Sequence, residues 1–305
     1  MVSAIPAQSR VPTADGLHLS VETHRADGHP ALLFAHGFGQ TRGAWSASAQ
    51  SLAAEGYRCV CFDSRGHGES DWLPGGGYQI DQFADDLTRV ARAQPTPPVL
   101  VGASMGGLIG LVVAGESLPS PFGALVLVDI TPRWETAGVE RILAFMQAHP
   151  EGFADYAHAA EEVASYLPQR GRKTEEQLRP LLREGADGRL RWHWDPAMLQ
   201  GVVSESERYQ PRLMAAAGRV DVPVLLISGG RSDVVSRETI AEFRQLVPHA
   251  QHVEMPAATH MLAGDANDAF TREIAAFLRQ LDPSLAANLS SNNLQHQPTR
   301  VSRCP

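Results

Sequence analysis

The stretch Gly102-Ala-Ser-Met-Gly106 constrains this chain more than any other, because of what stands on either side of it. Residues 98–101 form a short β-branched run typical of a buried strand, and residues 108–114 are apolar with helical character. Gly-x-Ser-x-Gly between a strand and a helix predicts a sharp, strained turn with Ser104 at its apex. Side chains in place of the glycines would collide there, and the N–H groups that open the helix would point toward whatever the serine attacks.

Apolar runs that alternate with helical segments predict an α/β architecture. Strands are expected within residues 11–25 (two, around an Asp-Gly turn), and at 31–35, 57–62, 98–103, 124–128, 223–228 and 252–254. Helices are expected at 44–55, 82–93, 108–114 and 265–281. This order predicts a mostly parallel sheet with helices on both faces.

Helical periodicity replaces the strand pattern between residues 131 and 220, at 139–148, 154–167 and 174–184. A segment of this length is too long for a plain loop in a compact domain, so we expect a small helical cap over the carboxyl ends of the strands. The predicted organisation is therefore a first core part (1–131), the helical cap (132–218), a second core part (219–282) and a polar, disordered tail (283–305).

Composition limits the kinds of partner. The chain is 43% hydrophobic and 20% charged with a net charge of −8, which is typical of a soluble protein and disfavours nucleic acid or anionic membrane. It shows no secretory signal or membrane-spanning run, and its three cysteines form no disulfide framework, so we expect a reducing cytoplasm. No His/Cys cluster has metal-binding spacing, and no P-loop lysine occurs, so no metal or cofactor is expected.

A serine hydroxyl becomes a nucleophile only when a base takes its proton, and that base needs a carboxylate to orient it. His260 follows the last expected strand and Asp233 follows the strand before it, so both should lie at the carboxyl edge of the sheet beside Ser104. Asp129, directly after the strand 124–128, is the alternative acid. We favour Asp233, and expect Asp129 to hold backbone amides near Thr131 instead.

Taken together, the motifs resemble those of the α/β-hydrolase fold family. The resemblance rests on His36-Gly-Phe-Gly39, Asp63-x-Arg-Gly-His-Gly-x-Ser70, Gly102-x-Ser-x-Gly-Gly107, Gly229-x-x-x-Asp233 and Thr259-His260, and it covers nearly the whole chain except the tail. It implies an eight-stranded sheet with the cap inserted after the sixth strand. The order Ser104, Asp233, His260 is the family's nucleophile–acid–base order. One departure is Thr259, where family members usually have glycine.

The resemblance also implies an oxyanion hole made by the backbone amides of Phe38 and Met105, with His36 orienting its loop. For substrate contacts we select His36, Gly37 and three tryptophans, Trp134, Trp192 and Trp194. Aromatic side chains of the cap would suit an apolar pocket, but most of them could equally attach the cap to the core. A substrate carboxylate could bind to a cationic or imidazole side chain of the cap, although such side chains are more often simply exposed to solvent. These candidates are Arg133, Arg141 and His193.

The resulting prediction is a serine hydrolase that cleaves a small to medium apolar carboxylic ester or lactone through an acyl-enzyme. On the same triad, carbon–carbon bond hydrolysis, amide hydrolysis and haloperoxidase-like perhydrolysis are alternatives. Two further classes remain open: a receptor-like protein that binds ligands without turnover, and a cofactor-independent oxygenase or lyase in which His260 is the base and Ser104 only binds. The expected partner is a small-molecule substrate, with a homodimer left open.

Overall fold

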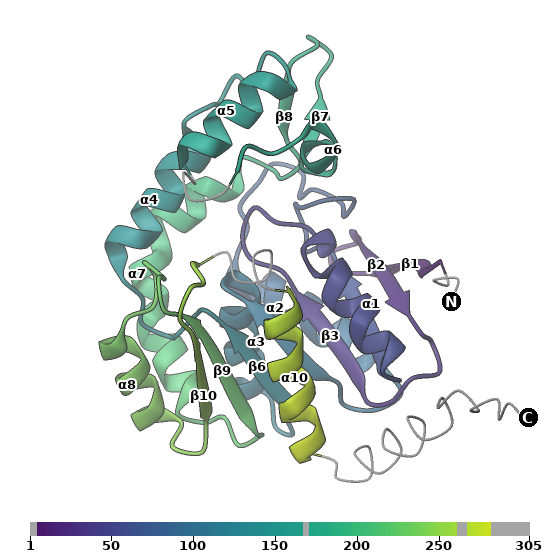
Figure 1. Ribbon diagram of the computed structural model, residues 1–305, viewed down its shortest axis with the longest axis vertical. Coiled ribbons are helices and arrows are strands. Elements are labelled where there is room, and N and C mark those ends of the chain that lie inside the picture. The colour runs from purple at the N-terminus through teal and green to yellow at the C-terminus, as the bar shows by residue number, and fades with distance from the viewer. Residues whose placement is uncertain (1–4, 167–170, 261–266, 282–305) are drawn as a thin grey trace, which may run out of the picture.

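The computed structural model describes residues 5–166, 171–260 and 267–281. Eight strands form one sheet in the order β1-β2-β4-β3-β5-β6-β9-β10 (Figure 1). They are β1 (Ala7–Pro12), β2 (His18–His24), β3 (Ala31–Ala35), β4 (Arg58–Phe62), β5 (Val99–Ala103), β6 (Ala124–Val128), β9 (Val224–Gly229) and β10 (Gln251–Met255). Only the β1–β2 and β2–β4 pairs are antiparallel, so the expected eight-stranded, mostly parallel sheet is confirmed.

The strand register brings the functional segments to one edge. Ala35 of β3 pairs with Gly102 of β5, and Val128 of β6 pairs with both Ala103 of β5 and Ile227 of β9. The carboxyl ends of these neighbouring parallel strands therefore lie side by side. Residues that directly follow β3, β5, β6 and β9 must meet at this edge, which is where ligands bind in open α/β sheets.

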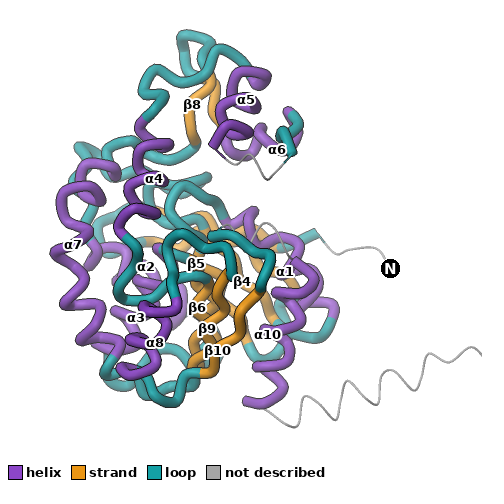
Figure 2. Tube along the Cα trace, turned by 60° about the vertical axis from the view of Figure 1, so that its left-hand side comes forward, coloured by secondary structure: helices purple, strands orange, loops and turns teal. Residues whose placement is uncertain are grey.

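Helices cover both faces of the sheet (Figures 1 and 2). The first face carries α1 (Ser46–Ala54), which follows the short 3₁₀ helix η1 (Arg42–Trp45), and α10 (Asn267–Leu281). The other carries α2 (Ile80–Arg92), α3 (Met105–Glu116), α8 (Arg237–Leu246) and the end of α7 (Met198–Ala217). Alternate side chains of each central strand pack against the helices of one face and then the other, as expected for a strand buried on both sides.

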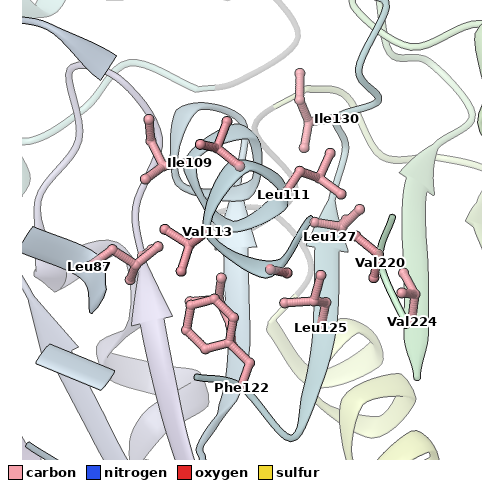
Figure 3. Packing of buried hydrophobic residues seen from close by; sticks show 14 of the residues in the cluster. Leu87, Ile109, Leu111, Val113, Phe122, Leu125, Leu127, Ile130, Val220 and Val224 are labelled. Atoms are coloured by element: carbon pink, nitrogen blue, oxygen red, sulfur yellow. The ribbon is translucent and has the colours of Figure 1, made fainter. Parts of the chain in front are cut away.

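β5 shows this alternation. Leu100 packs into the layer of α2, α3 and α7, while Val99 and Val101 face α1 and α10. Figure 3 shows the layer of α2, α3 and α7, where Val113 of α3 lies near Leu87 of α2 and Phe122. Every residue of β5 and β6 is buried, so the strand that leads to Ser104 is held from both faces.

The segment between β6 and β9, residues 129–223, is called the insertion here. It contains α4 (Thr136–Gln147), α5 (Tyr156–Tyr166), α6 (Glu175–Leu178), the 3₁₀ helix η2 (Arg179–Leu181), β7 (Leu182–Glu184), β8 (Leu190–Trp192) and α7. Its outer part, α5 to β8, stands beyond the carboxyl edge of the sheet with a small apolar core of its own (Figure 1). The last helix, α7, returns to pack along α3.

The expected helix over residues 174–184 is wrong in its second half. The helix ends at Leu178, and after η2 the chain forms an antiparallel hairpin in which Leu182 pairs with Trp192. Gly188 in the turn has a φ of +74°, which glycine adopts without strain, and Asp187 accepts hydrogen bonds from Arg191 across the hairpin end. The Asp-Gly pair at 187–188 was the sequence signal for this turn.

The other expected helices and strands form with shifts of one to three residues at most ends, whereas α7 and α8 have no counterpart among the ranges predicted from the sequence. No helix within the described ranges is both long enough and apolar enough to cross a bilayer. The predicted disordered tail, 283–305, lies outside the described residues.

Candidate active site

Ser104 occupies a strained turn between β5 and α3, as expected. Its φ of +46° and ψ of −116° fall in a region that residues other than glycine rarely adopt. A Cβ atom on Gly106 would lie 2.4 Å from the carbonyl oxygen of Ala35, and one on Gly102 would lie 2.7 Å from the carbonyl oxygen of Gly106. Only glycine fits at these two positions, so the motif lets the turn press against β3 and expose the serine.

His260 connects Ser104 to a carboxylate. Its Nε2 atom accepts a hydrogen bond from the Ser104 hydroxyl at 3.2 Å, and its Nδ1 atom lies 2.8 Å from Oδ2 of Asp129. The side chain of Asp129 is almost completely buried, and that of His260 is 12% exposed. A hydroxyl, an imidazole and a carboxylate in this order form the arrangement that activates a serine nucleophile.

The Asp129 carboxylate is held by two further donors besides His260. Oδ1 accepts from the Gly229 N–H at 2.7 Å, and Oδ2 accepts from the Ser232 hydroxyl at 2.6 Å. Such charge-assisted hydrogen bonds compensate the cost of burying a carboxylate. The expectation that Asp129 would hold amides near Thr131 is wrong, because its carboxylate turns toward the loop after β9.

Asp233, the acid favoured from the sequence, makes no hydrogen bond to His260. Its carboxylate forms an ion pair with Arg141 of α4, and its backbone carbonyl lies against Gly138, where a Cβ atom would come within 2.0 Å. The loop after β9 thus presents Gly229 and Ser232, not Asp233, to the site. We correct the prediction accordingly: the carboxylate that contacts His260 belongs to the alternative residue, Asp129.

Residues 36–40 follow β3 and lie against the serine; they are called the oxyanion loop here because the family resemblance predicts an oxyanion donor in them. A Cβ atom on Gly37 would be 3.3 Å from Cβ of Ser104. The N–H groups of Gly37 and Gly39 donate to Gln40 Oε1 at 3.0 Å and His67 Nε2 at 3.1 Å. The N–H of Phe38 between them has no acceptor in the part of the chain that the structure describes.

Met105, directly after the serine, has a second N–H group to consider. As the first residue of α3, it has no carbonyl one helical turn earlier to accept from its N–H. Both Phe38 and Met105 line the same cavity as Ser104. The two residues whose amides were chosen from motif position therefore share the cavity of the serine, and their role as oxyanion donors stays a prediction.

Three buried imidazoles support this site from behind. Each accepts a backbone N–H with one ring nitrogen and donates to a backbone carbonyl with the other. His36 accepts from the Ser64 N–H (3.0 Å) and donates to the Gly37 carbonyl (2.8 Å). His67 accepts from the Gly39 N–H (3.1 Å) and donates to the Arg65 carbonyl (3.1 Å). His193 accepts from the Gly68 N–H (2.9 Å) and donates to the Gly39 carbonyl (3.2 Å). Burial lowers the pKa of all three, that of His193 to about 4, so the rings are neutral at pH 7.

A cavity of about 190 Å³ opens at Ser104 and His260. Its wall combines the core with the insertion and is mostly apolar. The lining residues are Phe38, Tyr78, Gln79, Ile80, Phe83, Ser104, Met105, Leu108, Ile109, Ile130, Trp134, Val139, Ile142, Leu143, Met198, Tyr209, Leu213, Val234 and His260. No Asp, Glu, Lys or Arg side chain from the described ranges lines it.

Of the expected substrate contacts, only Trp134 lies on this wall. Trp194 packs with its ring centroid 6.1 Å from that of Phe38, and Trp192 packs against Phe153 at 5.2 Å. Trp194 therefore attaches the insertion to the core, and Trp192 packs within the insertion. Both have the packing role that the sequence left open for the aromatic residues of the cap. His36 is fully buried and acts on the loop backbone.

The cationic candidates of the insertion are also engaged elsewhere. Arg133 pairs with Glu242 at 2.7 Å, and Arg141 pairs with Asp233. Neither these arginines nor His193 line the cavity.

Sequence reasoning missed most of the apolar wall, although one signal was present. Val139, Ile142 and Leu143 of α4 follow the i, i+3, i+4 spacing of a buried helix face, and that face turns toward Ser104. Among the described residues, no group of three or more His, Cys, Asp or Glu side chains could hold a metal ion.

Comparison with known proteins gives consistent results. Residues 30–266 match the family model described as alpha/beta hydrolase fold. The chain is 34% identical over 244 residues to the 3-hydroxybutyrate-oligomer hydrolase of Cupriavidus necator, covering 75% of this chain and 82% of that protein. It is 26% identical over 275 residues to the 3-oxoadipate enol-lactonase 2 of Acinetobacter baylyi, covering 88% and 96%. The crystal structure of E-2-(acetamidomethylene)succinate hydrolase superposes with a TM-score of 0.76 at 25% identity, covering 90% of this chain and 99% of that one.

The neutral imidazoles make stability depend on pH. In the unfolded chain each histidine titrates near pH 6.5, whereas burial holds the native pKa lower, so the unfolded state binds more protons as the pH falls below about 6.5. The free energy of unfolding should therefore decrease from pH 7 to 5, by up to about 1.4 kcal/mol per pH unit for each such histidine. Urea unfolding at several pH values measures this slope. His193→Gln should make this slope shallower by the contribution of one proton. A free energy of unfolding that does not change between pH 7 and 5 in the native protein would contradict the conclusion that these histidines are neutral.

Proposed function

The chain belongs to the α/β-hydrolase fold family, and on this basis we propose that it is a serine hydrolase acting on a neutral carboxylic ester or lactone. The acyl group is small to medium and apolar, and the reaction passes through an acyl-enzyme. One observation carries the proposal: the hydrogen-bonded series Ser104, His260, Asp129 ends at an apolar cavity.

In the proposed mechanism the Ser104 oxygen attacks the carbonyl carbon while His260 Nε2 takes its proton. Asp129 accepts the hydrogen bond from Nδ1 and stabilises the imidazolium that forms. The N–H groups of Phe38 and Met105 bind the oxyanion, and His260 then protonates the leaving alkoxide. A water molecule deprotonated by His260 attacks the acyl-enzyme and releases the acid and the free Ser104 hydroxyl.

The lining of the cavity supports a neutral substrate. A carboxylate buried in an apolar wall without a cation costs several kcal/mol, and Arg133 and Arg141 are paired outside the cavity. The cavity volume of about 190 Å³ is below the roughly 300–1,000 Å³ typical of pockets for drug-sized ligands. This difference supports a small to medium acyl group. A relative that acts on 3-hydroxybutyrate oligomers and one that acts on an enol-lactone support ester and lactone bonds as the targets.

The nucleophile is tested with a fluorophosphonate probe, which reacts with activated serines. The native protein should be labelled, and Ser104→Ala should lose the label together with about 10⁴-fold or more in kcat/KM for a p-nitrophenyl ester. Ser9→Ala, in the exposed edge strand β1, is the matched control and should behave as the native protein. Hydrolysis that survives in Ser104→Ala would reject the acyl-enzyme and favour a lyase or oxygenase in which His260 alone acts.

The acid is tested by comparing Asp129→Asn with Asp233→Asn. Asp129→Asn should lower kcat about 10⁴-fold, because the amide leaves His260 in the wrong tautomer without removing its hydrogen-bonding side chain. Asp233→Asn removes only an ion pair with the largely exposed Arg141, so kcat should change less than about threefold. Urea unfolding checks that both variants are folded. The opposite ranking would return the role to Asp233.

A panel of p-nitrophenyl esters tests the cavity. Each added methylene should raise kcat/KM about fourfold, equivalent to about 0.8 kcal/mol of burial, until the cavity is full. At equal chain length, the mono-p-nitrophenyl ester of glutarate should react at least about 100-fold more slowly than the pentanoate ester, because its free carboxylate must be buried. A faster anionic ester would contradict the neutral-substrate proposal. Ethyl pentanoate and δ-valerolactone, which are both neutral and have the same acyl length, separate ester from lactone preference in the same panel.

A further inference from the structure

Gly39 of the oxyanion loop is held by imidazoles from two separate parts of the chain. Its N–H donates to Nε2 of His67, which lies in the loop after β4, at 3.1 Å. Its carbonyl oxygen accepts from Nε2 of His193, 154 residues further along in the insertion, at 3.2 Å. The peptide groups on both sides of Gly39 are therefore fixed, one from the core and the other from the insertion.

His193 is itself rigidly placed. Its side chain is buried, and Nδ1 accepts the N–H of Gly68 at 2.9 Å, which leaves the proton on Nε2 to face Gly39. Two residues later, the N–H of Asp195 donates to the carbonyl of Gly66 at 2.8 Å, and its carboxylate accepts from the Tyr78 hydroxyl at 2.7 Å. The segment 193–195 thus docks on the loop after β4 through several hydrogen bonds.

The backbone at Gly39 needs such support. Its φ is +75°, a conformation open to glycine, and glycine has few steric barriers that would keep its neighbouring peptide groups in one orientation. The ring of Phe38, directly before it, packs against those of His67 and Trp194, at centroid distances of 5.6 and 6.1 Å.

The carbonyl of Gly39 shares its peptide group with the N–H of Gln40, which donates to the carbonyl of Gly37 at 3.1 Å. That carbonyl belongs to the peptide group that carries the Phe38 N–H. His193 therefore acts on the Phe38 N–H through this hydrogen bond, and Trp194 contacts the Phe38 side chain.

We propose that His193 is a positioning residue, which aims the Phe38 N–H at the developing oxyanion by holding the carbonyl of Gly39. The oxyanion hole is then complete only when the insertion is docked, so the insertion sets turnover as well as substrate fit. This inference rests on the proposed function, because it takes the Phe38 N–H to be an oxyanion donor.

Three substitutions separate the two hydrogen bonds of His193. His193→Gln can keep an N–H donor for the Gly39 carbonyl, and His193→Asn can keep an acceptor for the Gly68 N–H. His193→Phe keeps a ring of similar size and neither bond. His249→Gln is the matched control, since His249 also bonds a backbone carbonyl, that of Val222 at 2.9 Å, but stands before β10 at the opposite edge of the sheet.

The expected readout is a fall in kcat with KM changed by less than about threefold. Removing a whole oxyanion donor costs on the order of 10²–10³ in turnover, so a misaimed donor should cost about tenfold in His193→Asn and His193→Phe. His193→Gln should stay within about threefold of the native protein. Inhibition by a phenylboronic acid, whose serine adduct places an oxygen in the oxyanion hole, should weaken in parallel with kcat across the series.

A merely structural role would give a different pattern. Equal kcat in all folded variants, equal losses in His193→Gln and His193→Asn, or a change in KM with unaltered boronic acid affinity would each overturn the inference. If His193→Phe fails to fold, the comparison of His193→Gln with His193→Asn still decides it. These outcomes are independent of the Ser104→Ala labelling, which tests the proposed function itself.

Discussion

The buried carboxylate of Asp129 is the interaction on which the architecture of the site depends. It stands at the end of β6 and binds the backbone N–H of Gly229, the hydroxyl of Ser232 and the ring of His260. The loops that follow β9 and β10 are thereby tied to the strand next to β5. Because a buried carboxylate is costly without donors, the loops and Asp129 stabilise one another.

A second set of buried polar groups acts on the oxyanion loop. Burial keeps His36, His67 and His193 neutral, and a neutral imidazole can accept with one nitrogen and donate with the other. Each ring therefore links two backbone segments that secondary structure leaves unpaired. The same rings would lose one acceptor on protonation, and because burial lowers the pKa of all three, that loss requires a pH well below the ordinary histidine value.

The insertion contributes in two ways. Side chains of α4 and α7, such as Ile142 and Leu213, form part of the apolar wall, while Trp194 and His193 contact the oxyanion loop. The insertion thus contributes both to the cavity wall and to the contacts that hold the oxyanion loop. Gly39 shows how tightly the parts fit, because a Cβ there would come within 2.9 Å of Met146 in α4.

The amino-acid sequence by itself determined the sheet, the position of the insertion and much of the site. A strand–turn–helix around Ser104, and a histidine after the last strand, are local patterns that parallel strand order converts into a shared edge. Motif position also predicted the amides of Phe38 and Met105 as oxyanion donors, and both residues line the cavity at Ser104. These predictions depend on backbone periodicity and chain order, which can be read without knowing how distant segments pack.

Only the tertiary structure decided which carboxylate meets His260, since Asp129 and Asp233 both follow strands at the same edge. The deciding factor is loop conformation: Asp129 has a φ of +49° that turns its side chain inward, and Asp233 is drawn toward α4 by Arg141. The hydrogen bond between His193 and Gly39, and most of the cavity wall, were likewise decided by tertiary structure. Each results from contacts between residues far apart in the chain, and no local pattern encodes the direction in which such a side chain points. The β7–β8 hairpin differs, because its Asp-Gly turn was a local signal that the helical periodicity of residues 174–184 obscured.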